Sequence, residues 1–172
     1  PSRLASEQQL EDMILRDPSI LSNDWMLIGH QVVTSHGGRI DLLAIAPDAS
    51  LVLIELKRDR TPREIVAQAL DYASWVEHQK AVHVARIFKQ FSESRGVRSM
   101  SLNEAFKERF GLELDEEALN QSHQIIIVAA ELDPSTERII GYLSARDIAI
   151  NVVFFQVFSH GSDKLLSRAW LI

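Results

Sequence analysis

Two strand-like segments joined by a short turn, Gly38 to Lys57 (GRIDLLAIAPDASLVLIELK), constrain the fold of this chain more than any other feature. Side chains on a strand alternate between its two faces. In the second segment, Leu53, Glu55 and Lys57 therefore share one face, and Val52, Ile54 and Leu56 share the other. The turn chemistry of Pro47-Asp48-Ala49-Ser50 predicts an antiparallel hairpin. Two charged side chains thus project together from an otherwise apolar strand.

The register of this hairpin decides whether a third charged residue, Asp41, joins them. In the first segment one face carries Arg39, Asp41, Leu43 and Ile45. A loop of odd effective length places Asp41 opposite Glu55 or Lys57, whereas an even loop without a bulge places it on the wrong face, because a slip of one residue exchanges the faces. We predict the register that brings the three charges together.

An aspartate, a glutamate and a lysine in this arrangement suit metal-dependent hydrolysis of phosphodiesters. Mg²⁺ prefers hard oxygen ligands and keeps several waters, so one or two carboxylates and a substrate phosphate suffice. We predict that Asp41 and Glu55 supply the carboxylates and the main-chain carbonyl of Leu56 a third ligand. Lys57 would hold or polarise the attacking water and offset charge on the phosphate. Glu55 and Lys57 alone more often mark the solvated end of a strand, but Asp41 at hairpin distance favours a site.

With two flanking motifs, the chain resembles the PD-(D/E)xK nuclease superfamily, and more closely its RecB-like and NucS/EndoMS-like branch. The motifs occur in the family's order: a helix with glutamates (SEQQLEDMILRDPSIL), GRID with Asp41, IELK with Glu55 and Lys57, and QALDY with Gln68 and Tyr72. Ile40 replaces the proline before the aspartate. The resemblance implies a restriction-endonuclease-like core, in which helices flank a mixed sheet, and hydrolysis of nucleic-acid phosphodiesters with Mg²⁺ or Mn²⁺.

The first helix offers two glutamates for the catalytic position that the resemblance implies. Glu7, Leu10, Glu11 and Ile14 fall on one side of this helix. Glu7 lies nearest the centre of the stripe that Leu4 forms with the other apolar residues, so we choose Glu7, with Glu11 as the alternative. A favourable interaction of either glutamate with the helix dipole would be purely structural.

The helix after the site contributes Gln68 and Tyr72. Pro62 suits its first turn, and its apolar stripe consists of Ile65, Ala69, Tyr72 and Val76. From these residues alone, a core tyrosine whose hydroxyl is capped by Gln68 is the simpler interpretation. The resemblance instead implies that both side chains face the end of the sheet near Lys57 and bind phosphate or the lysine.

Basic residues crowd around the same motifs. We predict that the phosphate backbone of the substrate is bound by Arg39, Arg58, Arg60 and Arg63. The formal net charge of −6 opposes nucleic-acid binding. Much of the acidity, however, lies between residues 104 and 117, and a basic segment between residues 80 and 98 permits a locally positive face.

Composition predicts a single α/β domain. The 172 residues, 46% of them hydrophobic, can bury one sizeable core. Without cysteine, disulfides and cysteine-based zinc sites are excluded. The start lacks the apolar core of a signal peptide, and the longest apolar runs are too short to span a bilayer. We expect a cytoplasmic protein without membrane contact, and its apolar end is compatible with the N-terminal part of a longer protein.

The remaining sequence predicts alternating helices and strands. Helices are expected at 81–91, at 102–110 after a Ser101/Glu104 capping box and before Gly111, and from the Asp133-Pro134 start to residue 145. Strands are expected at 124–130, 151–158 and 164–172, and a short polar helix or linker at 113–121. Glycine-rich phosphate loops and a GxSxG elbow are absent from the sequence, and the histidines lack metal-binding spacing, so we predict them to be surface or hydrogen-bonded residues.

These features together predict a metal-dependent DNA endonuclease that selects DNA structure and not base sequence, since arginine contacts to phosphates carry no sequence information. NucS/EndoMS-like enzymes act on branched or mismatched DNA, so the resemblance points the same way. Sensing such a feature would involve a homodimer or an additional domain. Two alternatives stay open: a nucleic-acid- or protein-binding module without turnover, and an interaction domain whose carboxylates form only salt bridges.

Overall fold

The computed structural model describes residues 7–61, 63–160 and 163–172. Within them the elements follow the order α1 (Glu7–Arg16), a 3-10 turn (Pro18–Ile20), β1 (Met26–Val33), β2 (Arg39–Ile45), β3 (Leu51–Thr61), α2 (Glu64–Val76), α3 (Ala81–Ser94), α4 (Leu102–Phe110), β4 (His123–Leu132), α5 (Pro134–Ser144), β5 (Ile150–His160) and β6 (Asp163–Trp170). The strands form one mixed sheet in sequence order. The predicted α/β fold with a mixed sheet flanked by helices is confirmed.

The centre of the sheet is parallel and its two sides are antiparallel. β1, β2 and β3 pair antiparallel, β3, β4 and β5 pair parallel, and β6 returns antiparallel to β5. The parallel steps require crossovers, which the helices between β3 and β4 and α5 between β4 and β5 provide. The central strands are apolar on both faces, as strands covered by helices on both sides must be.

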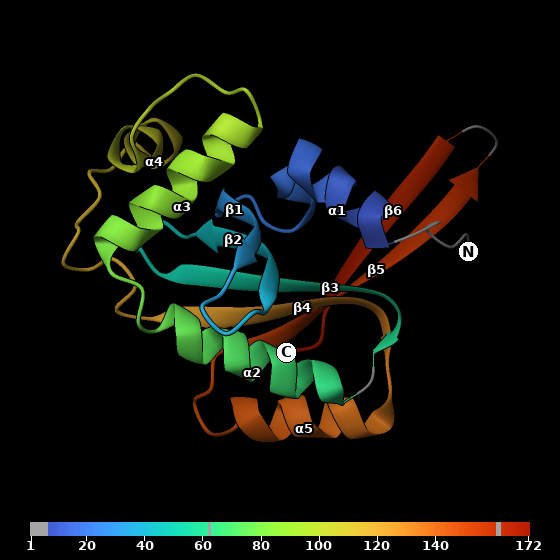
Figure 1. The fold of residues 1–172 in the computed structure, drawn as a ribbon. Helices are drawn as coiled ribbons and strands as arrows, with labels where there is room; N and C mark the ends of the chain where they lie inside the picture. The colour runs from blue at the N-terminus through green and yellow to red at the C-terminus, as the bar shows by residue number, and fades with distance from the viewer. Residues whose placement is uncertain (1–6, 62, 161–162) are drawn as a thin grey trace.

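Two hydrophobic clusters lie on opposite faces of the sheet. Figure 1 shows α1 and α2 on opposite sides of β3. Leu51 and Leu53 of β3 belong to the larger cluster, together with residues of α2, α3, α4 and α5. Val52, Ile54 and Leu56 belong to the smaller cluster, under Leu10 and Ile14 of α1. The predicted alternation of β3 is therefore confirmed, and it places α1 and α2 on opposite sides of the hairpin.

Several local predictions are also confirmed. Ser101 accepts a hydrogen bond from the Glu104 N–H, and the Glu104 carboxylate accepts one from the Ser101 N–H, which closes the predicted capping box of α4. Gly111 ends this helix with a left-handed φ of 68°. Asp133 caps α5 by accepting from the N–H groups of Ser135 and Thr136. The segment 113–121 is a turn-rich linker and contains no helix.

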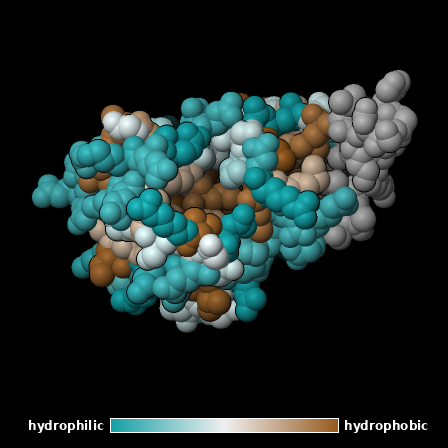
Figure 2. Space-filling view, turned by 90° about the horizontal axis from the view of Figure 1, so that it is seen from above, coloured by the Kyte–Doolittle hydropathy of each residue, from teal (hydrophilic) through white to brown (hydrophobic). Residues whose placement is uncertain are grey.

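The face of the molecule seen in Figure 2 combines polar residues with a hydrophobic hollow. Figure 2 looks onto the side of the molecule that carries α1, α3 and α4, and hydrophobic residues lie in a hollow bordered by polar ones. None of the helices in the described parts of the chain is long and apolar enough to cross a membrane.

Candidate functional site

The β2–β3 hairpin brings Asp41 and Glu55 together. Its paired residues run from Ile45 opposite Leu51 to Leu42 opposite Ile54. The next position in this register sets Asp41 against Glu55, so the predicted register is confirmed. The turn that produces it closes with a hydrogen bond from the Ala46 N–H to the Ser50 carbonyl.

Beyond the last pair of the ladder, Leu42 and Ile54, the two carboxylates accept hydrogen bonds from the neighbouring strand. Oδ2 of Asp41 accepts a hydrogen bond from the Leu56 N–H at 2.8 Å. Oε1 of Glu55 accepts one from the Asp41 N–H at 3.4 Å. Each carboxylate is therefore hydrogen-bonded to the main chain of the neighbouring strand, just beyond the end of the regular pairing of β2 with β3.

Both carboxylates resist ionisation at this place. Burial, followed by the negative charge of Asp41, raises the pKa of Glu55 from its ordinary value of 4.5 to about 8. Burial also raises the pKa of Asp41, although the hydrogen bond from Leu56 and the charge of Lys57 act in the opposite direction. Glu55 is only 1% exposed. Ionisation of one carboxyl therefore disfavours ionisation of its neighbour, and a cation bound between them would offset this repulsion.

The donor set fits a hard divalent ion that keeps most of its water. Within the described residues, no group of three or more His, Cys, Asp or Glu side chains is arranged so that it could hold a metal ion. Two carboxylates nevertheless satisfy the protein share of a Mg²⁺ shell, whose remaining positions belong to water and phosphate. Asp41 and Glu55 would hold the ion. A contribution from the Leu56 carbonyl stays a prediction.

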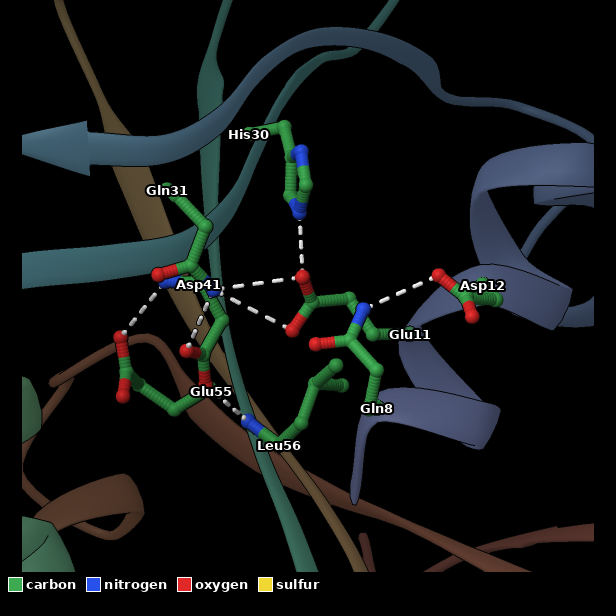
Figure 3. A network of polar contacts seen from close by, with 8 residues as sticks. All are labelled: Gln8, Glu11, Asp12, His30, Gln31, Asp41, Glu55 and Leu56. Carbon is green, nitrogen blue, oxygen red and sulfur yellow. Dashed lines mark hydrogen bonds and ion pairs between the residues drawn. The ribbon is translucent and has the colours of Figure 1, made fainter. Parts of the chain in front are cut away.

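The helix glutamate that is linked to Asp41 is Glu11 (Figure 3). Glu11 is 6% exposed, and both of its carboxylate oxygens accept hydrogen bonds from Nε2 of Gln31, at 3.3 and 3.2 Å. Nε2 of Gln31 also donates to Oδ1 of Asp41 at 3.3 Å. Glu7, our first choice, is exposed at the start of α1, and its charge contributes to the raised pKa of Glu55. Glu11 is thus linked to Asp41 through Gln31, and the catalytic role of either glutamate stays a prediction. Leu4 of the predicted stripe lies outside the described residues.

His30 and Gln31 of β1 are site residues that sequence reasoning did not single out. His30 contacts Oε1 of Glu11 through Nε2, in agreement with a hydrogen-bonded histidine. Gln31 has a left-handed φ of 51°, and the pairing of β1 with β2 shifts register between Leu27 and Gly29. The available signal was a polar pair inside the otherwise apolar strand MLIGHQVV.

Gln68 and Tyr72 are joined to each other and to the start of β2. Nε2 of Gln68 donates to the Tyr72 hydroxyl at 3.0 Å, and the Arg39 N–H donates to the same oxygen at 3.1 Å. The ring of Tyr72 packs so closely on Gly38 that a Cβ there would lie 2.3 Å from Cε1. These contacts match the structural interpretation that the residues alone favoured. Within the described residues, no hydrogen bond joins Tyr72 to Lys57.

The cationic residues near the site differ in their exposure and in the groups they interact with. Lys57 is half-buried, and its charge lowers the pKa of both Asp41 and Glu55. Arg39 is exposed at the beginning of β2. Arg63 lies at the surface before α2, where Nε is 3.6 Å from Oε1 of Glu64. The side chains of Arg58 and Arg60 lie outside the described residues, so their predicted phosphate contacts stay predictions.

A family comparison agrees with the arrangement of these motifs. The model of the endonuclease NucS C-terminal domain matches residues 6–111, which is more than half of the chain and includes α1, the hairpin and α2. The chain belongs to the NucS C-terminal domain family. The resemblance inferred from the four motifs is therefore confirmed. No curated protein matched the chain.

Three solved structures show similarity to this NucS-like chain, each at 17% sequence identity. A repair endonuclease from Pyrococcus abyssi has a TM-score of 0.48, with 87% of this chain and 47% of that chain covered. An EndoMS–dsDNA complex has a TM-score of 0.45, with coverage of 88% and 46%. EndoMS in its apo form has a TM-score of 0.47, with coverage of 87% and 46%. The chain thus spans just under half the length of these proteins.

Proposed function

We propose that this protein is a divalent-metal-dependent DNA endonuclease that hydrolyses phosphodiester bonds with a metal-activated water. The observation that carries the proposal is the pair of neighbouring carboxylates on β2 and β3: buried Glu55 accepts a hydrogen bond from the Asp41 N–H, and half-buried Asp41 accepts one from the Leu56 N–H. Their raised pKa values, caused first by burial, are typical of functional carboxyls and support this proposal. Membership in an endonuclease family supports the same reaction.

Each residue of the site has a distinct role in this proposal. Asp41 and Glu55 hold Mg²⁺ or Mn²⁺, which supplies Lewis acidity and lowers the pKa of a bound water. Gln31 and Leu56 orient the Asp41 carboxylate through the hydrogen bonds described above. The charge of Lys57 orients the attacking water and stabilises the charge that develops on the phosphate.

We also propose that cleavage depends on DNA structure and not on base sequence. The basic candidates near the site, Arg39, Arg58, Arg60 and Arg63, are suited to phosphates, which position DNA without identifying bases. A homodimer or an additional domain would complete the recognition of a branched or mismatched substrate. A scaffold that binds DNA without cutting it is the alternative.

The decisive experiment compares cleavage by the wild-type chain with cleavage by single-site variants. Substrates are single-stranded, flapped, mismatched and perfectly paired DNA in two unrelated sequences, with Mg²⁺, Mn²⁺ or EDTA. We expect metal-dependent cleavage of the structured substrates that is lost in Asp41→Asn, Glu55→Gln and Lys57→Ala. Circular dichroism checks that each variant is folded, and Glu77→Gln, which changes an exposed glutamate at the end of α2, is the matched control.

The possible outcomes separate the interpretations. Full activity in any two of the three site variants would refute the assignment of the site. A mobility shift without cleavage would favour the binding module. Cleavage that tracks one short base sequence in a perfect duplex, regardless of structure, would replace structure selectivity with restriction-type recognition.

A further inference from the structure

A groove of about 630 Å³ runs between β1 and α3, beside the carboxylate site. One wall comes from residues 29–35 of β1 and the turn that follows it. The opposite wall is a stripe of α3 that repeats every three to four residues, His83, Arg86, Ile87, Gln90 and Ser94, next to Trp75 of α2. In Figure 1, α3 lies alongside the β1 edge of the sheet, and the two elements are in contact.

The chemistry of the groove differs from that of the protein as a whole. The formal net charge of the chain is −6, yet the described residues that line the groove include no aspartate or glutamate. They include the guanidinium of Arg86 and the aromatic rings of Trp75 and Phe91, with the amides of Gln31, Gln79 and Gln90 among the polar groups. Arg86 and Gln90 are exposed, and Trp75 is half-buried against the core.

This set of groups suits an unpaired nucleotide. An aromatic face can stack on a base only after the base has left the double helix, amides can bond its polar edge, and arginine can bind its phosphate. A base that remains paired and stacked in a duplex does not offer its face. The combination therefore favours an unpaired strand over an intact duplex.

The groove is connected to the proposed reaction centre by two shared side chains. His30 and Gln31 both line it, and the same residues bond Glu11 and, through Gln31, Asp41. His30 and Gln31 therefore belong both to the lining of the groove and to the polar network that includes Asp41. This connection distinguishes the groove from a hollow elsewhere on the surface.

We propose that the β1–α3 groove is a subsite for unpaired nucleotides of the DNA strand that is cut. The proposal rests on the proposed nuclease function and deepens it, because it gives a physical basis for selecting flapped or mismatched DNA. Arg86 binds a backbone phosphate, and Trp75 stacks on an unpaired base.

The test measures binding separately from cleavage. Fluorescence anisotropy in EDTA reports the affinity of the full chain for a short labelled oligothymidylate and for a duplex of equal length. Arg86→Glu is compared with Lys89→Glu, which makes the same charge change on the same helix. Lys89 does not line the groove, and its side chain is 74% exposed and 3.9 Å from Glu93.

We expect Arg86→Glu to weaken oligothymidylate binding by about tenfold or more, because one phosphate contact is lost and a repulsive charge is added. Lys89→Glu should have a much smaller effect. Arg86→Gln should reduce the slope of log affinity against log salt by about one. In wild type, oligothymidylate should quench tryptophan fluorescence, and Trp75→Phe, which keeps an aromatic ring in the core, should remove most of the quenching.

Other outcomes would overturn the subsite. Equal effects of Arg86→Glu and Lys89→Glu would show only general electrostatics, and absence of measurable binding by the wild type would refute the site directly. Displacement by free dTMP with an affinity like that of the oligonucleotide would identify a mononucleotide site instead. The subsite and the proposed function can fail independently. Binding that depends on Arg86, without metal-dependent cleavage, would support the subsite and refute the nuclease function. Metal-dependent cleavage, with binding that Arg86→Glu does not change, would support the nuclease function and refute the subsite.

Discussion

Replacing Glu55 with glutamine should stabilise the metal-free protein at alkaline pH. Burial raises the pKa of Glu55 from 4.5 to about 8, so between these values the folded chain keeps a proton that the unfolded chain releases. The free energy of unfolding of the wild type must therefore fall as pH rises through this interval. A tenfold change in proton affinity corresponds to about 1.4 kcal/mol, so the whole fall attributable to Glu55 is at most about 5 kcal/mol.

Glutamine removes this ionisation but keeps an oxygen that can accept the hydrogen bond from the Asp41 N–H. In EDTA, the difference between Glu55→Gln and wild type should therefore be smallest near pH 4.5 and grow toward pH 8, in favour of the variant. Urea unfolding at a series of pH values measures it, with Glu64→Gln as the control for an exposed glutamate. Parallel stability curves for Glu55→Gln and wild type would show that Glu55 does not ionise with a raised pKa.

Three further predictions concern neighbouring features. Asp41→Asn should modestly stabilise the metal-free protein, because burial raises the pKa of Asp41. In thermal scans, Mg²⁺ at about one hundred times its Kd should stabilise the wild type by about 2.7 kcal/mol. Asp41→Asn should remove this stabilisation by the metal. Tyr72→Phe should lower the free energy of unfolding by about 1–3 kcal/mol, because the Arg39 N–H loses its acceptor; a loss of cleavage in the folded variant would instead favour the catalytic role. Ser101→Ala should cost about 1 kcal/mol in urea unfolding through loss of the α4 cap, and an unchanged midpoint would contradict the importance of the capping box.

Local periodicity correctly predicted that the hairpin brings Asp41 and Glu55 together. A strand has period two whatever its surroundings, so Glu55 and Lys57 had to share a face with Leu53, and the turn restricted Asp41 to a few registers. The capping box of α4 and its glycine end were predictable for the same reason, since their hydrogen bonds join residues close in sequence.

The assignment of Gln68 and Tyr72 shows where such reasoning stops. The spacing of four residues correctly allowed the hydrogen bond between them. The second partner of the Tyr72 hydroxyl, the Arg39 N–H, lies 33 residues away in sequence and becomes a neighbour only when α2 packs against the β1–β2 turn.

The sequence by itself determined the mixed α/β character of the protein, the alternation of β3 and the family motifs, because each depends on residue types at short separations. Only the tertiary structure decided that Glu11 of α1 contacts His30 and Gln31 of β1. Glu11 lies 19 and 20 residues from them in the sequence, so these contacts depend on how α1 crosses the sheet. The position of Gln31 depends on the irregular pairing of β1 with β2 and on its left-handed backbone, and no periodic pattern in the sequence encodes either feature.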